Sequence, residues 1–180
     1  MKYFLITHQE NFDFAIATKY ILATDWDIDA EIIVGHTISD KYPRTGVLHH
    51  NWIDYVLPKC IESGESCIVF EDDVRLKQNI KDLPYDDFDL IWFGFRRGKL
   101  TNKNHRVTGT QGLYLNKDIL KDVYDNFIQY KRKIHLDHLV SKFCMEFIDK
   151  YRITQTKLSY CYEKEHDSLI SLDDWSKYTK

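Results

Sequence analysis

Short apolar runs alternate with amphipathic stretches along this sequence, and its opening shows the pattern most simply. Lys2–Thr7 and Ala30–Gly35 are short and rich in apolar residues, which predicts two β-strands. Between them, the spacing of the apolar positions predicts a helix over Phe12–Ala23. The positions at helical spacing are Phe12, Ala15, Ile16, Lys19 and Tyr20. The order strand, helix, strand predicts that the two strands lie parallel in one sheet.

The same alternation continues along the rest of the chain. A helix is predicted over Gly46–Glu62, and Pro58 within it is expected to kink the helix or divide it into two pieces. A loop with a short helical turn is expected over Arg75–Leu83. Further strands are predicted at Cys67–Phe70, Phe88–Gly94, Val107–Leu115 and Lys157–Cys161, and further helices over 116–128 and 134–148. This order predicts an α/β fold with a mostly parallel sheet flanked by helices.

The overall composition is that of a soluble globular protein. We expect a single domain over residues 1–180, because no repeat, linker or change of composition divides the sequence. The net charge of −3 argues against a generally basic surface but leaves room for local basic patches. No apolar run approaches the roughly 20 residues that span a bilayer, and no signal peptide is evident. We therefore expect a cytoplasmic protein, and the abundance of Lys, Ile, Tyr, Asp and Asn is typical of an AT-rich bacterial or viral genome.

The four cysteines add little to this picture. They show no CxxC spacing and lie in apolar contexts, at Cys60, Cys67, Cys144 and Cys161. Buried, reduced thiols are therefore expected rather than disulfides or a zinc site.

The most distinctive stretch is the apolar run Cys67–Phe70, which ends in Glu71, Asp72 and Asp73. Burying an unpaired carboxylate costs several kcal/mol, so three acids at the end of a core strand call for a cation or hydrogen-bond donors. Because side chains alternate along a strand, Glu71 and Asp73 are expected to point the same way and Asp72 the opposite way. Two carboxylates at the carboxyl end of a strand suit Mg²⁺ or Mn²⁺. The alternative is a solvated acidic turn.

Basic residues and histidines mark other candidate contacts. The segment 95–106, which includes Arg96 and Arg97, is the most basic part of the chain and lacks apolar periodicity, so we expect a loop. Such a loop either contacts a diphosphate or an anionic acceptor, or is simply solvated. His8 and His36 follow the ends of the first two predicted strands, where either could touch a ligand. A second basic cluster lies at 131–133.

The order of these elements resembles the bacterial lipopolysaccharide glycosyltransferase family that also includes collagen galactosyltransferases. In that family a helix with a glycine turn leads into an apolar strand and an EDD motif, here Glu71–Asp73. A strand with an aromatic-glycine end follows, here 92–94, and then a Gly-Thr segment before a Tyr-containing strand, here 109–118. An Asp that begins a helix is matched by Asp137, and a closing Ser-x-Ile element is matched at 168–170.

The resemblance covers most of the chain from about Gly46 to Ser171, and only the EDD stretch is specific in its letters. It implies a single Rossmann-like domain of the GT-A type, a nucleoside-diphosphate sugar as donor, and Mn²⁺ or Mg²⁺ as cofactor. On this reading Glu71 and Asp73 hold the cation, which stabilises the charge on the leaving group. His166, close to the end of the chain, is a third candidate ligand of the metal or the diphosphate.

The same reading assigns the remaining candidate residues. Asp72 faces the ribose or sugar hydroxyls of the donor, with Thr7 and His8 as further donor contacts. Arg96 or Arg97 assists at the diphosphate.

Asp137 is the candidate base that takes the proton of the acceptor hydroxyl in an inverting displacement. The alternative for Asp137 is an ordinary carboxylate at a helix N-terminus, favoured by the helix dipole.

Several functions stay open at this level. The acceptor of a metal-dependent glycosyltransferase could be a glycan, or a hydroxymethylated base in phage DNA, since the basic clusters would bind phosphates. A non-catalytic nucleotide- or glycan-binding module with the same fold is the alternative from another class. A metal-dependent phosphotransferase or nuclease ranks lower, because two-metal sites usually draw more carboxylates from separate strands.

Overall fold

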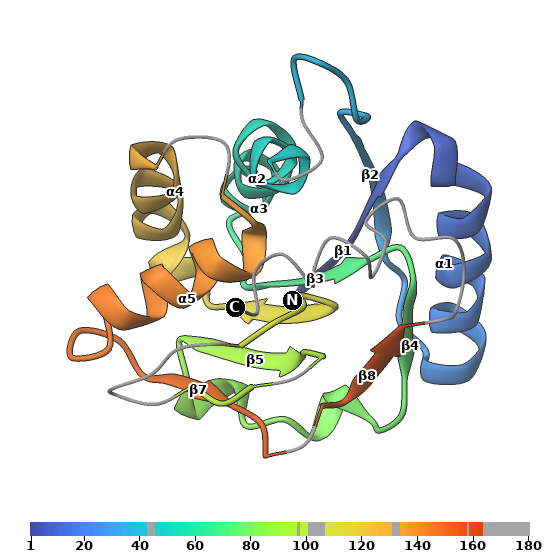
Figure 1. The fold of residues 1–180 in the computed structure, drawn as a ribbon. Coiled ribbons are helices and arrows are strands. Elements are labelled where there is room, and N and C mark those ends of the chain that lie inside the picture. Colours follow the sequence, from blue (N-terminus) through green and yellow to red (C-terminus); the bar gives the residue numbers. More distant parts are fainter. Residues whose placement is uncertain (43–45, 97, 101–106, 131–133, 158, 164–180) are drawn as a thin grey trace.

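A computed structural model describes residues 1–42, 46–96, 98–100, 107–130, 134–157 and 159–163. Six strands form its central sheet in the order β2-β1-β3-β6-β5-β7 (Figure 1). Their bounds are Lys2–His8 for β1, Glu31–Gly35 for β2, Cys67–Glu71 for β3, Leu90–Gly94 for β5, Gly112–Leu115 for β6 and Ile153–Gln155 for β7. All neighbouring strands are parallel except where β6 pairs with β3 and β5. The predicted α/β class, the mostly parallel sheet and the parallel β1–β2 pair are confirmed.

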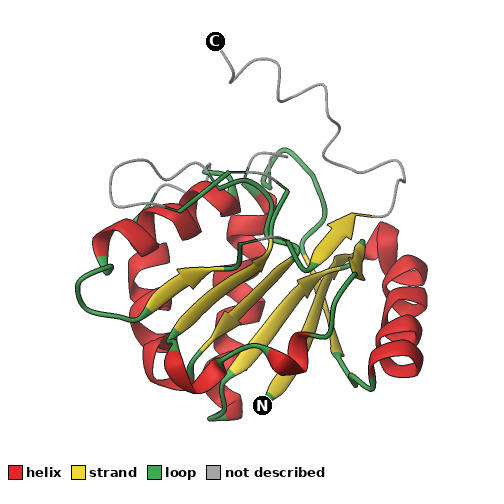
Figure 2. Cartoon of the chain, turned by 90° about the horizontal axis from the view of Figure 1, so that it is seen from below, coloured by secondary structure: helices red, strands yellow, loops and turns green. Residues whose placement is uncertain are grey.

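Helices cover both faces of the sheet (Figures 1 and 2). One face carries α1 (Phe12–Trp26) and a small antiparallel sheet of β4 (Val74–Leu76) and β8 (Cys161–Glu163). The opposite face carries the remaining helices: α2 (Val47–Asn51), the π-helical turn η2 (Trp52–Val56), α3 (Leu57–Ser63), α4 (Leu120–Gln129) and α5 (Leu136–Glu146). Short 3₁₀ turns complete the described elements at Gln9–Asn11, Ile80–Asp82, Tyr85–Asp87 and Lys117–Ile119.

The two faces have separate hydrophobic cores, and strand alternation divides the apolar residues between them. In β3, Cys67 and Val69 join the core under α2–α5, whereas Ile68 and Phe70 join the core under α1. A strand that is buried on both faces needs apolar residues at every position. This requirement explains why β3 is an uninterrupted apolar run in the sequence.

The helix predicted over Gly46–Glu62 is divided into α2 and α3, one of the two outcomes expected from Pro58. Proline lacks an N–H, so it cannot donate to the carbonyl four residues earlier in a regular α-helix. The chain accommodates this with the π-helical turn Trp52–Val56, after which α3 begins with Pro58 in its first turn. Trp52 itself is almost completely buried, at 1% exposure.

Three sequence-based predictions of secondary structure are wrong in position. The last strand, predicted over Lys157–Cys161, begins only at Cys161, where β8 starts. The strand predicted from Val107 begins only at Gly112, because residues 108–111 form a loop with other contacts. The predicted loop over 75–83 begins with the last two residues of a short strand, β4, that pairs with β8, whereas its expected helical turn is present at Ile80–Asp82.

The predicted apolar face of the first helix is also wrong. Ile16 and Tyr20 are 49% and 69% exposed, and the buried positions of α1 are Ala15, Thr18 and Leu22. One of the three residues facing the sheet is therefore polar, which matters for the site below.

All four cysteines are buried and free. Within the described residues, no helix is long and apolar enough to cross a membrane.

Candidate functional site

The acidic residues lie where the central strand β3 ends. Glu71 is the last residue of β3, Asp72 and Asp73 form a turn, and β4 begins at Val74. Asp72 and Asp73 are each only 9% exposed. The solvated acidic turn considered from the sequence is therefore wrong, because these two carboxylates are largely removed from water.

Asp72 is held from two sides on the face of the sheet that α1 covers. The Thr7 hydroxyl, at the end of β1, donates to Asp72 Oδ2 at 2.6 Å. The Thr18 hydroxyl, on α1, donates to the main-chain oxygen of Asp72 at 2.6 Å. In turn, Arg75 Nη1 donates to the Thr18 Oγ1 at 2.7 Å and to the Val74 carbonyl at 2.6 Å. Both the side chain and the carbonyl of Asp72 are thus fixed by neighbouring elements.

The guanidinium of Arg75 is itself part of the interior. Arg75 is 8% exposed, and its guanidinium carbon lies 5.6 Å from the ring centroid of Phe14 on α1. A cation over an aromatic ring is favourable, more so when both are desolvated. Phe14 and Thr18, one turn apart on α1, therefore dock the helix against the acidic turn through Arg75.

Glu71 makes its contact with a different part of the chain. It accepts a hydrogen bond from the hydroxyl of Thr110, in the loop before β6. The preceding residue, Gly109, donates its N–H to Asp137 Oδ2 at 3.3 Å. Asp137, in the first turn of α5, is 5% exposed and also accepts from the N–H of His138 at 2.8 Å. Two acids that are far apart in the sequence are thus bonded to adjacent residues of one loop.

Buried contacts hold this loop in place. The indole N–H of Trp92, on β5, donates to the Gly109 carbonyl at 3.0 Å. Two residues later, a Cβ on Gly94 would overlap the backbone nitrogen of Gly112. The aromatic-glycine end of β5 therefore has two physical roles, since Trp92 anchors the loop and Gly94 permits close approach of β6.

The prediction that Glu71 and Asp73 point the same way assumes that both belong to one strand. This assumption is wrong, because β3 ends at Glu71 and Asp73 lies in the turn that follows. Nevertheless, both acids influence the pKa of the Cys161 thiol, on β8. Burial raises the pKa of Cys161 most, Lys77 lowers it, and the negative charges of Glu71 and Asp73 raise it further. The negative charges of Glu71 and Asp73 therefore both contribute to the electrostatic environment of Cys161.

A polar and aromatic group adjoins the acidic turn at the ends of β1 and β2. His8 is 6% exposed, and its Nδ1 lies 2.6 Å from the His36 carbonyl, to which it must donate. In the neutral imidazole with this tautomer, Nε2 is an acceptor. The Asn51 side chain accepts from the His36 N–H at 2.6 Å, and the His36 ring stacks on Tyr42 with centroids 3.7 Å apart. His36 Nε2 also lies 2.9 Å from Asp54 Oδ2.

The basic loop residues are placed only in part. Arg96 donates its backbone N–H to the Thr108 carbonyl at 2.7 Å, which puts it beside the loop that contacts Glu71 and Asp137. Arg97 lies outside the described residues.

His166 also lies outside the described residues. The strand before it is informative, because β8 pairs Glu163 with Val74. Backbone at the end of β8 is therefore adjacent to the residue that follows Asp73.

The donor set at the turn fits a hard cation. Glu71 and Asp73 offer carboxylate oxygens, the ligands that Mg²⁺ and Mn²⁺ prefer. Among the described residues, no group of three His, Cys, Asp or Glu side chains is arranged to hold a metal. A cation bound by two carboxylates would take its remaining ligands from water and a diphosphate, as Mg²⁺ commonly does.

Sequence reasoning missed Thr18 and Arg75, and it used Thr110 only as part of a motif. The sequence position of a threonine in a helix does not indicate which group its hydroxyl will bond. The only available signal was that Thr18 falls three residues after Ala15, on the face that proved to be buried.

Comparison with known proteins supports the fold. No family model and no curated protein matches the sequence. Among solved structures, a glycosyltransferase involved in the glycosylation of the major capsid of PBCV-1 matches with a TM-score of 0.56 and 12% identity, over 87% of this chain and 82% of that one. A nucleoside-diphosphate-sugar pyrophosphorylase from Vibrio cholerae matches with a TM-score of 0.53 and 12% identity, over 98% and 80%.

A third similar structure is a mutant of Drosophila β-1,4-galactosyltransferase 7 in complex with manganese, UDP-Gal and xylobiose. It matches with a TM-score of 0.50 and 10% identity, over 100% of this chain and 80% of that one. At such identities these likenesses show the fold alone. The chain has a GT-A-like α/β fold, which glycosyltransferases and nucleotide-sugar pyrophosphorylases share.

The network around Asp72 makes a prediction about stability. In Thr18→Val the Asp72 carbonyl loses its donor and Arg75 loses an acceptor while side-chain volume is kept, which should cost about 2 kcal/mol. For a chain of this length the melting temperature should fall by about 4–8 °C. Thermal unfolding of the variant and of the unchanged protein measures this difference. Thr24→Val on the same helix is the control, because the Thr24 hydroxyl is exposed and bonds the Tyr20 carbonyl. Equal melting temperatures for the two variants would contradict the role given to Thr18.

Proposed function

We propose that this protein is a metal-dependent glycosyltransferase that moves a sugar from a nucleoside-diphosphate donor to a hydroxyl acceptor. The observation that carries the proposal is the convergence of Glu71 and Asp137 on adjacent loop residues, Thr110 and Gly109. It brings a candidate metal ligand and a candidate base to one edge of the sheet. The GT-A-like fold, shared with a manganese- and UDP-Gal-bound transferase, supports it.

Glu71 and Asp73 are the proposed ligands of Mn²⁺ or Mg²⁺, with His166 as a further candidate. The cation supplies Lewis-acid stabilisation of the negative charge that builds up on the leaving diphosphate. The protein contributes a rigid turn. Since Asp72 is bonded through both its carboxylate and its carbonyl, the turn that carries Asp73 is ordered before any cation arrives.

Asp72, Thr7 and His8 are the proposed contacts of the donor. Thr7 occupies one lone pair of Asp72 Oδ2, and an ionised carboxylate has further acceptor sites for ribose or sugar hydroxyls. The Nε2 of His8, left as an acceptor by the bond of Nδ1 to His36, suits a donor hydroxyl or a base N–H. Arg96 and Arg97 would stabilise the diphosphate as charge-assisted donors.

Asp137 is the proposed base. Each of its oxygens accepts one backbone N–H, from Gly109 and His138, which orients the carboxylate and leaves lone pairs on both oxygens. One of these would accept the proton of the acceptor hydroxyl as it attacks the sugar. Its burial keeps bulk water away from the site of attack.

The wider identity of the protein is part of the same proposal. The motif order supports membership of the lipopolysaccharide and collagen galactosyltransferase type, with residues 1–180 as one catalytic domain. The non-catalytic binding module is less well supported, because nothing in nucleotide binding alone requires a buried carboxylate at the position of Asp137.

Removing the charge of Asp73 tests the metal ligand. Asp73→Asn should weaken Mn²⁺ binding by at least about tenfold and should abolish Mn²⁺-dependent UDP binding, because a hard cation loses an anionic oxygen. Manganese binding followed by electron paramagnetic resonance, and calorimetry with UDP, GDP and dTDP, measure both effects. Asp118→Asn, which is exposed, is the control. If Asp73→Asn binds Mn²⁺ and nucleotides like the unchanged protein, the metal assignment is wrong.

Asp137→Asn separates binding from chemistry. Nucleotide and Mn²⁺ affinity should be preserved, whereas the rate of transfer, or of slow hydrolysis of a UDP-sugar, should fall by about 10²–10⁴-fold because the general base is lost. Release of UDP from a panel of UDP-sugars with Mn²⁺ provides the measurement. A variant that keeps the full rate would show that Asp137 is only a helix-terminal carboxylate.

A further inference from the structure

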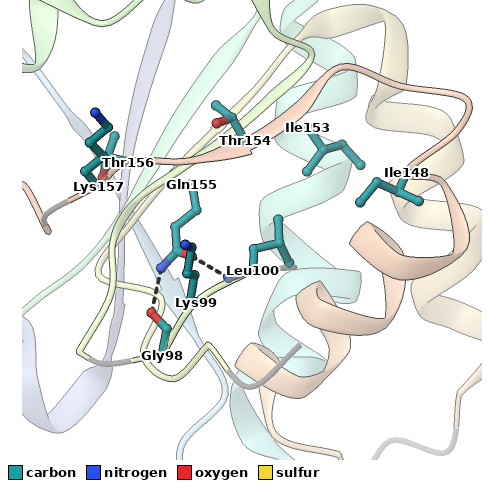
Figure 3. Close-up of a pocket in the computed structure, with 9 residues that line it drawn as sticks. All are labelled: Gly98, Lys99, Leu100, Ile148, Ile153, Thr154, Gln155, Thr156 and Lys157. Atoms are coloured by element: carbon teal, nitrogen blue, oxygen red, sulfur yellow. Dashed lines mark hydrogen bonds between the residues drawn. The ribbon is translucent and has the colours of Figure 1, made fainter. Parts of the chain in front are cut away.

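A cavity of about 400 Å³ lies beside the edge strand β7, away from the acidic turn. One wall is β7 with the residues that follow it, and the facing wall is the segment Gly98–Leu100 (Figure 3). Ile148, just after α5, closes one end. The volume falls within the range of small-molecule sites, which is about 300–1,000 Å³.

A side-chain clamp holds the two walls at a fixed separation. Gln155 Oε1 accepts from the Leu100 N–H at 2.6 Å, and its Nε2 donates to the Gly98 carbonyl at 3.1 Å (Figure 3). One amide therefore bridges β7 to both ends of the facing segment. The cavity is thus formed without a ligand, so a ligand would not bear the cost of ordering its walls.

The lining has an apolar end and a polar, cationic end. Leu100, Ile148 and Ile153 gather at one end, whereas Lys99 and Lys157 lie toward the other (Figure 3). Thr154 and Thr156 also belong to the lining. Sugar rings have apolar C–H faces and polar edges, so they match such a surface better than a purely apolar or purely charged molecule does.

Lys99 and Lys157 differ from the other lysines in the described part of the chain. Most of those form an ion pair with a carboxylate: Lys2, Lys19, Lys59, Lys81, Lys117, Lys121 and Lys150. Lys41 and Lys142 each lie over a tyrosine ring. Neither Lys99 nor Lys157 has such a partner among the described residues. In a chain with a net charge of −3, two lysines that have no carboxylate partner in the described part of the chain and lie beside one cavity favour an anionic ligand.

The cavity also lies on the side of the molecule where an acceptor would extend. β7 is parallel to β5, and β5 is parallel to β3 through the antiparallel β6 between them, so the carboxyl ends of β3 and β7 meet the same edge of the sheet. Three strand spacings separate β3 from β7, or about 14 Å. An oligosaccharide spans this distance, and a single sugar does not.

We propose that this cavity binds an acidic sugar of an oligosaccharide acceptor, several units away from the hydroxyl that reacts at the acidic turn. The inference rests on the proposed glycosyltransferase function and adds the class of acceptor. Lys99 and Lys157 bind the acidic group, and the Leu100, Ile148 and Ile153 side chains pack against the ring. A ligand that reaches both places is held by two separated contacts, which raises the effective concentration of its reactive hydroxyl.

Ligand titrations without donor or metal test this. Trigalacturonic acid should shift the amide resonances of 98–100 and 153–157, and its methyl ester, which has the same rings without the charges, should bind at least about fivefold more weakly. Mannose 6-phosphate against mannose shows whether a phosphate serves in place of a carboxylate. Lys99→Ala combined with Lys157→Ala should weaken the acidic ligand about tenfold. Lys117→Ala combined with Lys121→Ala, which removes the same charge on another surface, should not.

Three results would overturn the inference. The first is equal affinity for the acidic and the neutral sugar. The second is that the Lys99/Lys157 and Lys117/Lys121 double variants weaken the acidic ligand equally. The third is that a DNA duplex shifts the same resonances and competes as well as the acidic sugar, which would indicate a nucleic-acid acceptor. None of these outcomes touches Mn²⁺ or UDP binding at Asp73. A failure here is therefore distinguishable from a failure of the glycosyltransferase proposal.

Discussion

The geometry of this protein depends on how the buried carboxylate of Asp72 is satisfied. A charged group that is 9% exposed needs hydrogen-bond donors, because leaving it unpaired would cost several kcal/mol. Thr7 supplies a donor to its side chain, and Thr18 supplies one to its carbonyl. The two threonines come from β1 and α1, so the contacts of the acidic turn depend on the first strand and the first helix packing beside β3.

Strand order explains why the donors converge there. β3 lies between β1 and β6, with Ile6 opposite Glu71 on one side and Phe70 opposite Gly112 on the other. Thr7 therefore continues from β1 beside Asp72, and the loop before Gly112 passes beside Glu71. That loop carries the contact to Asp137, which links the first turn of α5 to the end of β3. Because β6 is antiparallel to β3, the loop that precedes β6 lies beside the carboxyl end of β3, where the acidic residues are.

Features that depend only on neighbouring residues in the sequence could be predicted. The apolar run of β3, its terminal acids and the parallel pairing of β1 and β2 could all be read from local pattern. The partners of the acids could not, since a hydrogen bond such as that of Thr18 depends on which helix face meets the sheet, and Ile16 and Tyr20 pointed to the wrong face. β7 was missed for a similar reason. Ile153–Gln155 is too short to be recognised by composition, and it is a strand because β5 offers it an edge.

The proposed function requires a cation bound between Glu71 and Asp73. The most direct test is anomalous diffraction from crystals soaked with Mn²⁺ and UDP. We predict a manganese peak in contact with carboxylate oxygens of both residues and with the diphosphate, while the bonds of Asp72 to Thr7 and Thr18 stay intact. Manganese bound elsewhere, with UDP remote from the end of β3, would contradict the account.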